Sequence, residues 1–375
     1  MVDGVKGSRL LVRLEAEIGA ARSSVEADSK RAERAAYLSR LGRGTEARSC
    51  LDAIRARYEL HPNAEISSWL HLVEGLVAHF SDMSPDARGK ILRAHALSSA
   101  ANSPRIHALS AAWLAHMDYL QVNVVSMALH ALEALRCSSE QDHATRSRVG
   151  LVVAQAYHLA DRLDLALPWY GSARNHASAE GDDATLSALI HNMAWLRVHR
   201  LRATDCELAA VPTHEDQHAL LGVESTTNFD LLIGSTSLNA LVPMLRAQVL
   251  TVRKQYAEAL ILFETEMTSA LRSGMTRLHA DLLADQAWCR LKLGQHEPAL
   301  QDALTAEASI DQKGQFDDRA MAHGRLSQAF SMLGLPADAR RNRHLAEQAW
   351  AGHALLQAKI VRLLEEVPPP GVDRR

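Results

Sequence analysis

The chain has 375 residues, of which 47% are hydrophobic and only 5% are aromatic, and its formal net charge at pH 7 is −3. A charge this close to neutral gives no reason to expect nucleic acid or an anionic membrane as a partner, because both select strongly basic surfaces. The alanine and leucine bias favours helices, and strand patterns are scarce. The composition therefore predicts an all-α protein.

The cysteines and the N-terminal segment bear on the compartment. Cys50, Cys137, Cys206 and Cys289 lie far apart, without paired spacing, which predicts thiols of a reducing compartment rather than a disulfide framework. The first 25 residues contain no long apolar segment, and no run of 18 apolar residues occurs anywhere. We therefore expect a cytoplasmic protein without a membrane partner.

In chain order, an amphipathic helix over residues 8–22 precedes a serine-rich break at 23–29. Helical pairs then follow over 30–60, 64–101, 104–137 and 145–180, with Pro62, Pro85 and Pro104 marking helix ends or starts. A further helix opens near Ser187. The tract from Val211 to Ser237 carries Pro, Gly, Thr and Asp where a repeat boundary is due, which indicates an insertion loop.

Three regular pairs begin near residues 238, 276 and 317. The sequence thus predicts an ordered series of segments: an N-terminal helix and linker (1–29), N-terminal repeats (30–210), an irregular insertion (211–237), C-terminal repeats (238–348), a C-terminal helix (349–367) and a disordered tail, PPPGVDRR (368–375).

A small residue in the first helix of a pair recurs twelve positions before a small residue in the second helix. Two helices of a hairpin approach closely only where neither presents a bulky side chain. The last three copies keep a period of 40 residues, which predicts stacked helical hairpins rather than one closed globule. The pairs are Ala35 and Ala47, Ala154 and Ala166, Ala247 and Ala259, Ala287 and Ala299, and Ser327 and Ala339.

The turns between these helices, LGRGTEAR, KQYAEAL, LGQHEPAL and LGLPADAR, resemble those of the tetratricopeptide repeat (TPR) family. Arg290 and Arg343 depart from the aromatic residues common in that family, and the turn at Asp161-Arg162 lacks glycine. The resemblance implies a right-handed superhelical solenoid of antiparallel helix hairpins. It also implies that the first helices line a concave groove that binds another protein or a peptide.

Residues just after each small residue, or one helical turn away, face the groove in this family. The resemblance implies a neutral, polar groove with two exposed tryptophans, suited to extended peptide backbone and apolar side chains. Packing of Trp195 and Trp288 between repeats is the alternative. The partner-binding residues expected in this way are Gln155, His158, His191, Trp195, Gln248, Trp288 and Gln328.

The string His214-Glu215-Asp216-Gln217-His218 matches the H-E-x-x-H pattern of zinc proteases. The charged Asp216, the irregular surroundings and the lack of a third ligand argue against such a site. We expect no catalytic residues, no metal and no cofactor, and a zinc hydrolase on His214, Glu215 and His218 is the remote alternative.

The C-terminal segment carries a heptad seam. It predicts a helix that caps the end of the repeats, and a short coiled coil that makes a homodimer is the alternative. The seam consists of Ala349, His353, Leu356, Ile360, Leu363 and Val367.

Taken together, these patterns predict a non-catalytic protein–protein interaction module. The alternative is a regulatory sensor that binds a small ligand or signal peptide and relays the change through the C-terminal helix, as similar repeats do in bacterial signalling.

Overall fold

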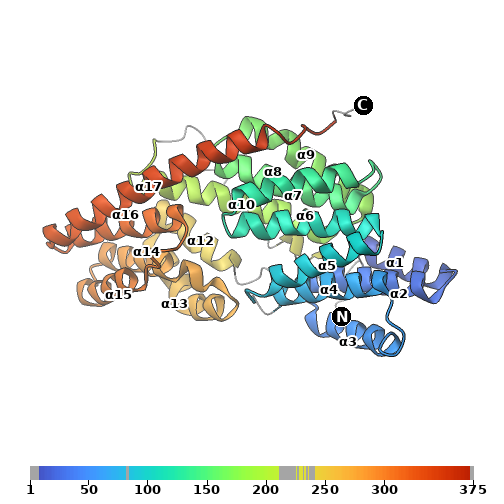
Figure 1. Ribbon diagram of the computed structural model, residues 1–375. Helices are drawn as coiled ribbons and strands as arrows, with labels where there is room; N and C mark the ends of the chain where they lie inside the picture. Colours follow the sequence, from blue (N-terminus) through green and yellow to red (C-terminus); the bar gives the residue numbers. More distant parts are fainter. Residues whose placement is uncertain are drawn as a thin grey trace. The chain divides into compact units, whose positions relative to one another are not determined.

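The computed structural model describes residues 8–81, 84–210, 225, 228–230, 232, 233, 235 and 241–371. All secondary structure in these residues is helical (Figure 1), which confirms the all-α prediction. The first helices are α1 (Arg9–Ala20), α2 (Ser24–Arg40), α3 (Gly44–Arg57), α4 (Ala64–Phe80), α5 (Ala87–Ala100), α6 (Pro104–Leu120), α7 (Val124–Cys137), α8 (His143–Leu159), α9 (Leu163–Glu180) and α10 (Asp183–Asp205). They are followed by α12 (Leu241–Val252), α13 (Tyr256–Arg272), the short 3₁₀ helix η1 (Met275–Leu278), α14 (His279–Lys292), α15 (His296–Ser309), α16 (Phe316–Met332) and α17 (Pro336–Leu364).

The chain divides into two compact units. Unit 1 contains residues 1–189, 228–237 and 359–375, and unit 2 contains residues 190–227 and 238–358. The boundaries between the units fall inside α10, inside the tract 211–237, at the end of that tract, and inside α17. Most of that tract lies outside the described residues, so its insertion loop stays a prediction. Among the described helices, none has both the length and the apolar character needed to cross a membrane.

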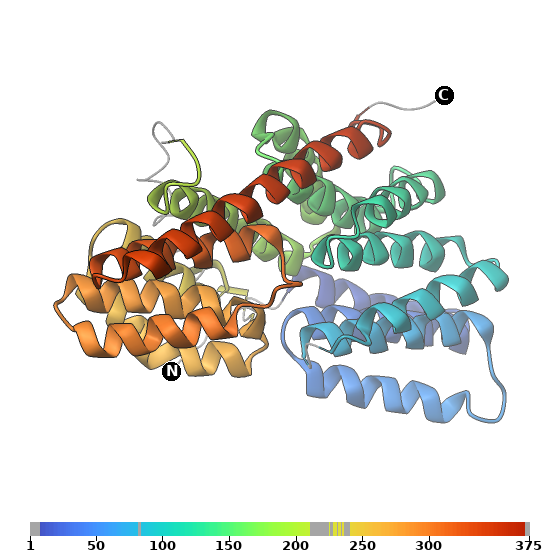
Figure 2. The same ribbon diagram turned by 60° about the vertical axis from the view of Figure 1, so that its left-hand side comes forward.

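Unit 1 is built from the antiparallel hairpins α2–α3, α4–α5, α6–α7 and α8–α9. The first helices also contact one another in sequence, α2 with α4, α4 with α6 and α6 with α8. Figure 2 shows α2 to α5, coloured blue to cyan, lying side by side. Each hairpin therefore buries its apolar face against the next one, as stacked supersecondary units require.

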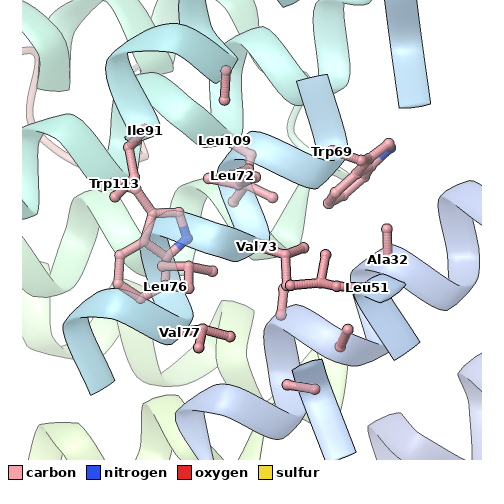
Figure 3. Packing of buried hydrophobic residues seen from close by; sticks show 14 of the residues in the cluster. Ala32, Leu51, Trp69, Leu72, Val73, Leu76, Val77, Ile91, Leu109 and Trp113 are labelled. Carbon is pink, nitrogen blue, oxygen red and sulfur yellow. The ribbon is translucent and has the colours of Figure 1, made fainter. Parts of the chain in front are cut away.

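Helix α4 supplies several residues of a hydrophobic core cluster of unit 1. In Figure 3 its Trp69, Leu72 and Leu76 lie among side chains of the neighbouring helices, including Ile91 of α5. Gly75 permits this close approach, because a Cβ atom there would lie 2.5 Å from Cγ1 of Ile91. The alternation of bulky and very small residues therefore fixes how α4 and α5 pack.

Unit 2 repeats the arrangement with the hairpins α12–α13 and α14–α15, and α14 also contacts α16. The predicted small residues lie where the paired helices approach. Ala287 and Ala299 are fully buried, and the same holds for Ala247 and Ala259. In the last hairpin the Oγ atom of Ser327 donates a hydrogen bond of 3.0 Å to the carbonyl oxygen of Ala339. The spacing of twelve therefore marks real helix contacts.

The turns that follow α2, α6, α8, α12, α14 and α16 have one geometry, whatever their sequence. The second residue after the first helix adopts a left-handed backbone, as at Gly294 (φ 77°), Asp161 (φ 57°) and Val122 (φ 59°). The next backbone N–H donates to the carbonyl five residues earlier, for example from Gln295 to Arg290 at 2.9 Å. This is the Schellman arrangement, which satisfies the last carbonyls of the first helix. The turn at Asp161 therefore keeps the shared geometry without glycine.

Two predicted boundaries are wrong. The break expected at 23–29 is helical, because Ser23 is a helix N-cap whose Oγ atom accepts from the backbone N–H of Glu26 at 3.1 Å. The Glu26 carboxylate in turn accepts from the backbone N–H of Arg22 at 2.8 Å, so this Ser-x-x-Glu string is a capping signal and not a linker. The helix expected from Ala349 is not separate, since α17 runs unbroken from Pro336 to Leu364.

The heptad seam on α17 continues past its end. Ala349, His353, Ile360 and Val367 of the seam are buried in the single chain, Leu356 and Leu363 are partly buried, and Leu355, beside the seam, is 75% exposed. The capping helix and the short coiled coil both stay predictions.

We predict that Val122→Gly raises the free energy of unfolding by about 0.5–1 kcal/mol, because a β-branched residue is strained at positive φ. Urea denaturation of the full chain measures it. Gly294→Val is the matched change, and it should lower the free energy of unfolding by a similar amount. No atom lies within 4 Å of a Cβ atom built at Gly294, so backbone strain and not a clash would cause the loss. A destabilised Val122→Gly protein would show that packing of the Val122 side chain outweighs the strain.

Candidate functional site

Unit 2 contains a buried network of charged side chains. Arg202 of α10 donates two hydrogen bonds of 2.7 Å to the carboxylate of Asp281, and its Nη2 atom lies 2.7 Å from Oδ2 of Asp285. The Nε atom of Arg325 on α16 donates to Oδ1 of Asp285 at 2.8 Å, and its Nη2 atom donates to Asp205. All these residues but Asp205 are almost fully buried, so one network ties α10, α14 and α16 together.

The helical repeat explains why these groups meet. Asp281 and Asp285 are four residues apart on α14, so both project from one face of that helix. Burial alone lowers the pKa of Arg202, but the two carboxylates outweigh it and raise that pKa. Burial raises the pKa of Asp281, against the opposing effect of Arg202. The network is thus held by bidentate, charge-assisted hydrogen bonds that compensate for desolvation.

Four of the predicted binding residues border this network. Gln248 is buried and donates to Asp281 at 3.3 Å, while Gln328 accepts from Arg325 at 2.8 Å and donates to the carbonyl of Asp205 at 2.7 Å. The Arg325 guanidinium lies 5.4 Å from the ring centre of Trp288. Trp288 and Trp195 are partly buried against core residues of unit 2. The two glutamines therefore already have partners within the fold.

The structure distributes the other three predicted residues differently. His191 is completely buried in unit 2. Gln155 is buried in unit 1, where His158 lies with its Nδ1 atom 3.1 Å from the Tyr170 hydroxyl. Partner binding by the set of seven stays a prediction.

A small cleft lies beside the network of unit 2. Its space for the centre of a water molecule is about 10 Å³, which is room for one water rather than for a peptide side chain. Its lining brings Trp195 and Gln248 together with charged residues of the network; the full set is Trp195, His199, Arg202, Gln248, Leu278, Asp281, Asp318 and Met321.

The acidic residues near this cleft differ in their proton affinity. Burial, followed by the charges of Asp317 and Asp281, raises the pKa of Asp318 to about 7 despite Arg277 nearby. Asp317 lies 3.1 Å from Nε2 of His199, and this pairing outweighs burial and holds the pKa of Asp317 well below its usual value. Asp318 therefore binds a proton more readily than Asp317 does.

A larger cleft lies in unit 1, at residues that the sequence did not single out. It measures about 370 Å³, within the range of ligand-binding sites. Trp169 of α9 lies in its wall, and the prolines that follow α17 form part of the lining. Those lining residues are Leu132, Leu135, Arg136, Ser138, Glu140, Arg146, Trp169, Ser172, His176 and Pro368 to Gly371.

The rim of this cleft is polar and fixed by local contacts. Arg146 forms an ion pair of 2.7 Å with Glu140, and its Nε atom donates to the carbonyl of Ser139 at 2.7 Å. His176 lies 2.9 Å from His143 between their Nδ1 atoms. The aromatic wall, the basic rim and the adjoining proline segment suit contact with an extended polypeptide more than chemistry on a small substrate.

Unit 1 also contains a buried guanidinium with a different environment. Arg148 lies 3.9 Å over the ring of Trp113 and donates to the Thr185 hydroxyl at 3.4 Å. The nearby carboxylate of Asp182 is occupied by Arg40, through bonds of 2.8 and 3.0 Å. Burial and the charge of Arg40 lower the pKa of Arg148 well below its usual value. Within the described residues, Arg148 thus has an aromatic partner in place of a carboxylate.

Comparison with protein-family models and with curated proteins gave no match. Function is therefore inferred from the geometry of this chain. The string His214, Glu215 and His218 lies outside the described residues, so the structure does not place the remote zinc-hydrolase alternative.

We predict that Arg202→Met lowers the free energy of unfolding by about 3–5 kcal/mol, because it leaves two carboxylates buried without their counter-charge. Arg148→Met, a matched substitution, changes it by less than about 1 kcal/mol, since it removes a buried charge without stranding another. Urea unfolding of the full chain, followed by circular dichroism, compares the two. Equal losses would mean that the Arg202 network is no more than ordinary packing.

Proposed function

We propose that the chain is a non-catalytic module that binds an extended segment of another protein in the cytoplasm. In this proposal its hairpins continue the TPR-like pattern and form a right-handed solenoid. The consecutive contacts of first helices within each unit support it, because such stacking creates long continuous surfaces.

The observation that carries the proposal is the cleft of unit 1. Pro368 to Gly371 of the same chain contribute to its lining, beside Trp169. Proline-rich segments are pre-extended and dock well on aromatic walls, because little conformational entropy is lost on binding. The proline segment forms part of the wall of the cleft, so the same surface has the chemistry to contact a similar segment of a partner.

We expect the chain's own tail to compete with such a partner. A chain that ends at Val367 should bind a synthetic peptide of residues 368–375. The full chain should bind it at least about tenfold more weakly, because its own prolines already cover the wall that the peptide would contact, and that wall is free for only part of the time. Fluorescence anisotropy of the labelled peptide measures both affinities. A peptide with alanine at its three proline positions is the control.

Two substitutions locate the binding site. Ser172→Trp should block peptide binding by the shortened chain, because Ser172 lines the cleft of unit 1. The double change Trp195→Ala and Trp288→Ala should leave it intact. If only the double change of Trp195 and Trp288 abolished peptide binding, the site would be the groove expected from the sequence. If the shortened chain did not bind the peptide at all, the proposal would be contradicted.

The regulatory sensor is the second candidate. It is favoured by α17, an unbroken helix that contributes residues to both units. In that proposal a ligand binds to one unit and changes the part of α17 that belongs to the other unit. Ligand binding and relay of the signal are then separate functions of one chain.

A further inference from the structure

Two histidines and a glutamate converge in unit 1, away from the cleft described above. His95 belongs to α5, His107 to α6 and Glu133 to α7, and all three are partly buried. The Oε1 atom of Glu133 lies 3.1 Å from Nε2 of His107 and 3.4 Å from Nε2 of His95. The two imidazole rings are stacked with their centres 4.1 Å apart. Potential ligand atoms of the three residues all lie within 4.8 Å of one another.

Hydrogen bonds to two serines define which ring nitrogen of each histidine carries the proton. Ser110 donates its single hydroxyl proton to the carbonyl of His107 at 2.9 Å. Its oxygen, 3.2 Å from Nδ1 of His95, can therefore only accept there, so Nδ1 of His95 must be the donor. A neutral His95 then has a bare lone pair on Nε2.

The same argument applies to His107. Ser98 donates to the carbonyl of His95 at 2.8 Å, so its oxygen must accept from Nδ1 of His107 at 3.4 Å. The carbonyl of His95 lies 3.4 Å from the same Nδ1 atom, and a carbonyl only accepts. The serines therefore bind the two histidines reciprocally and leave both Nε2 atoms as acceptors.

Three acceptors facing one another repel unless a cation lies among them. A proton on one ring would join that ring to Glu133, but the lone pair of the other ring would still face the carboxylate. His130, 6.1 Å from His95 between ring centres, is held by Asp118 at 2.7 Å, and Asp118 is itself paired with Arg88 at 2.8 Å.

Two of the three ligand separations match those of a metal centre, and the third lies within 4.8 Å. Zinc bonds to histidine nitrogen and carboxylate oxygen are about 2.0–2.2 Å long, so neighbouring ligands of a tetrahedral site lie about 3.3–3.4 Å apart. The separations of 3.1 and 3.4 Å are close to that value. Hydrogen bonds from the second ring nitrogen of each histidine to a fixed acceptor are the usual support for a metal-binding imidazole.

We propose that His95, His107 and Glu133 bind one Zn²⁺ ion, with Ser98 and Ser110 orienting the two imidazoles. Three protein ligands leave a fourth position for water or for a ligand from a partner. The ion joins α5 of one hairpin to α6 and α7 of the next, so it stabilises the stacking of hairpins in unit 1. This site departs from the sequence-based expectation of no metal.

The sequence carries a signal for this site. The string His-Ala-Leu-Ser occurs at residues 95–98 and again at 107–110, and His-Ala-Leu-Glu occurs at 130–133. A spacing of three places the first and last residue of each string on the same face of a helix. The strings therefore supply both imidazoles, both serines and the carboxylate, and only the fold shows that they meet.

The test is zinc binding by the full chain, made metal-free with a chelator and titrated by calorimetry with mass spectrometry of the bound metal. We expect one Zn²⁺ per chain at this site and a higher thermal midpoint with zinc. Glu133→Gln and the double change His95→Gln and His107→Gln should each weaken binding by more than about 100-fold, and Ser98→Ala by about 10–100-fold. His143→Gln, a change in another histidine pair of unit 1, should bind as the unaltered chain does.

Folding is controlled for by comparing the metal-free variants with the metal-free unaltered chain, which should share the same helicity. Nitrogen-15 spectra of the histidines in the metal-free chain should show protons on Nδ1 of His95 and His107. Absence of stoichiometric zinc, or equal binding by Glu133→Gln, would overturn the proposal. If the double histidine variant still bound zinc, the zinc site would lie elsewhere, for example at His214 and His218, and this result would also overturn the proposal.

Discussion

The structure depends on the close crossing of paired helices at small residues. Ala287 and Ala299 have no exposed surface, and neither do the pairs Ala35 and Ala47, Ala154 and Ala166, and Ala247 and Ala259. The helices of these hairpins therefore meet with almost no side chain between them. The left-handed turn at Gly294, Asp161 or Val122 then returns the chain in one fixed geometry. Successive first helices then pack against one another within each unit, and this packing brings their polar groups together.

Polar groups on those faces have been buried in two ways. In unit 2 the guanidinium of Arg202 is matched by Asp281 and Asp285, so the charge is neutralised locally. In unit 1 Arg148 lies over Trp113. The network of unit 2 ties its helices together and leaves little room for a ligand. The larger cleft of unit 1, and the site of His95, His107 and Glu133, lie away from such a network.

Sequence reasoning succeeded where the determining contacts are local. The spacing between Ala287 and Ala299 reflects one hairpin, and the pattern is visible without any tertiary information. It failed at Ser23, where serines suggested a linker although the Ser-x-x-Glu string caps a helix. Arg202 and Asp281 are 79 positions apart, and nothing in either neighbourhood indicates the pairing. The cleft of unit 1 likewise forms because residues after α17 lie beside residues of α7 and α9, and their proximity cannot be predicted from the sequence of any one of these segments.

The most direct test of the close-crossing constraint is the stability of Ala299→Leu against Ala308→Leu on the same helix. Ala299 is fully buried at the crossing and Ala308 is exposed. Urea unfolding should show a loss of about 1–3 kcal/mol or more for Ala299→Leu, because added methylenes force the helices apart. It should show almost no change for Ala308→Leu. Equal stability of the two variants would contradict the claim that the hairpins cross at these small residues.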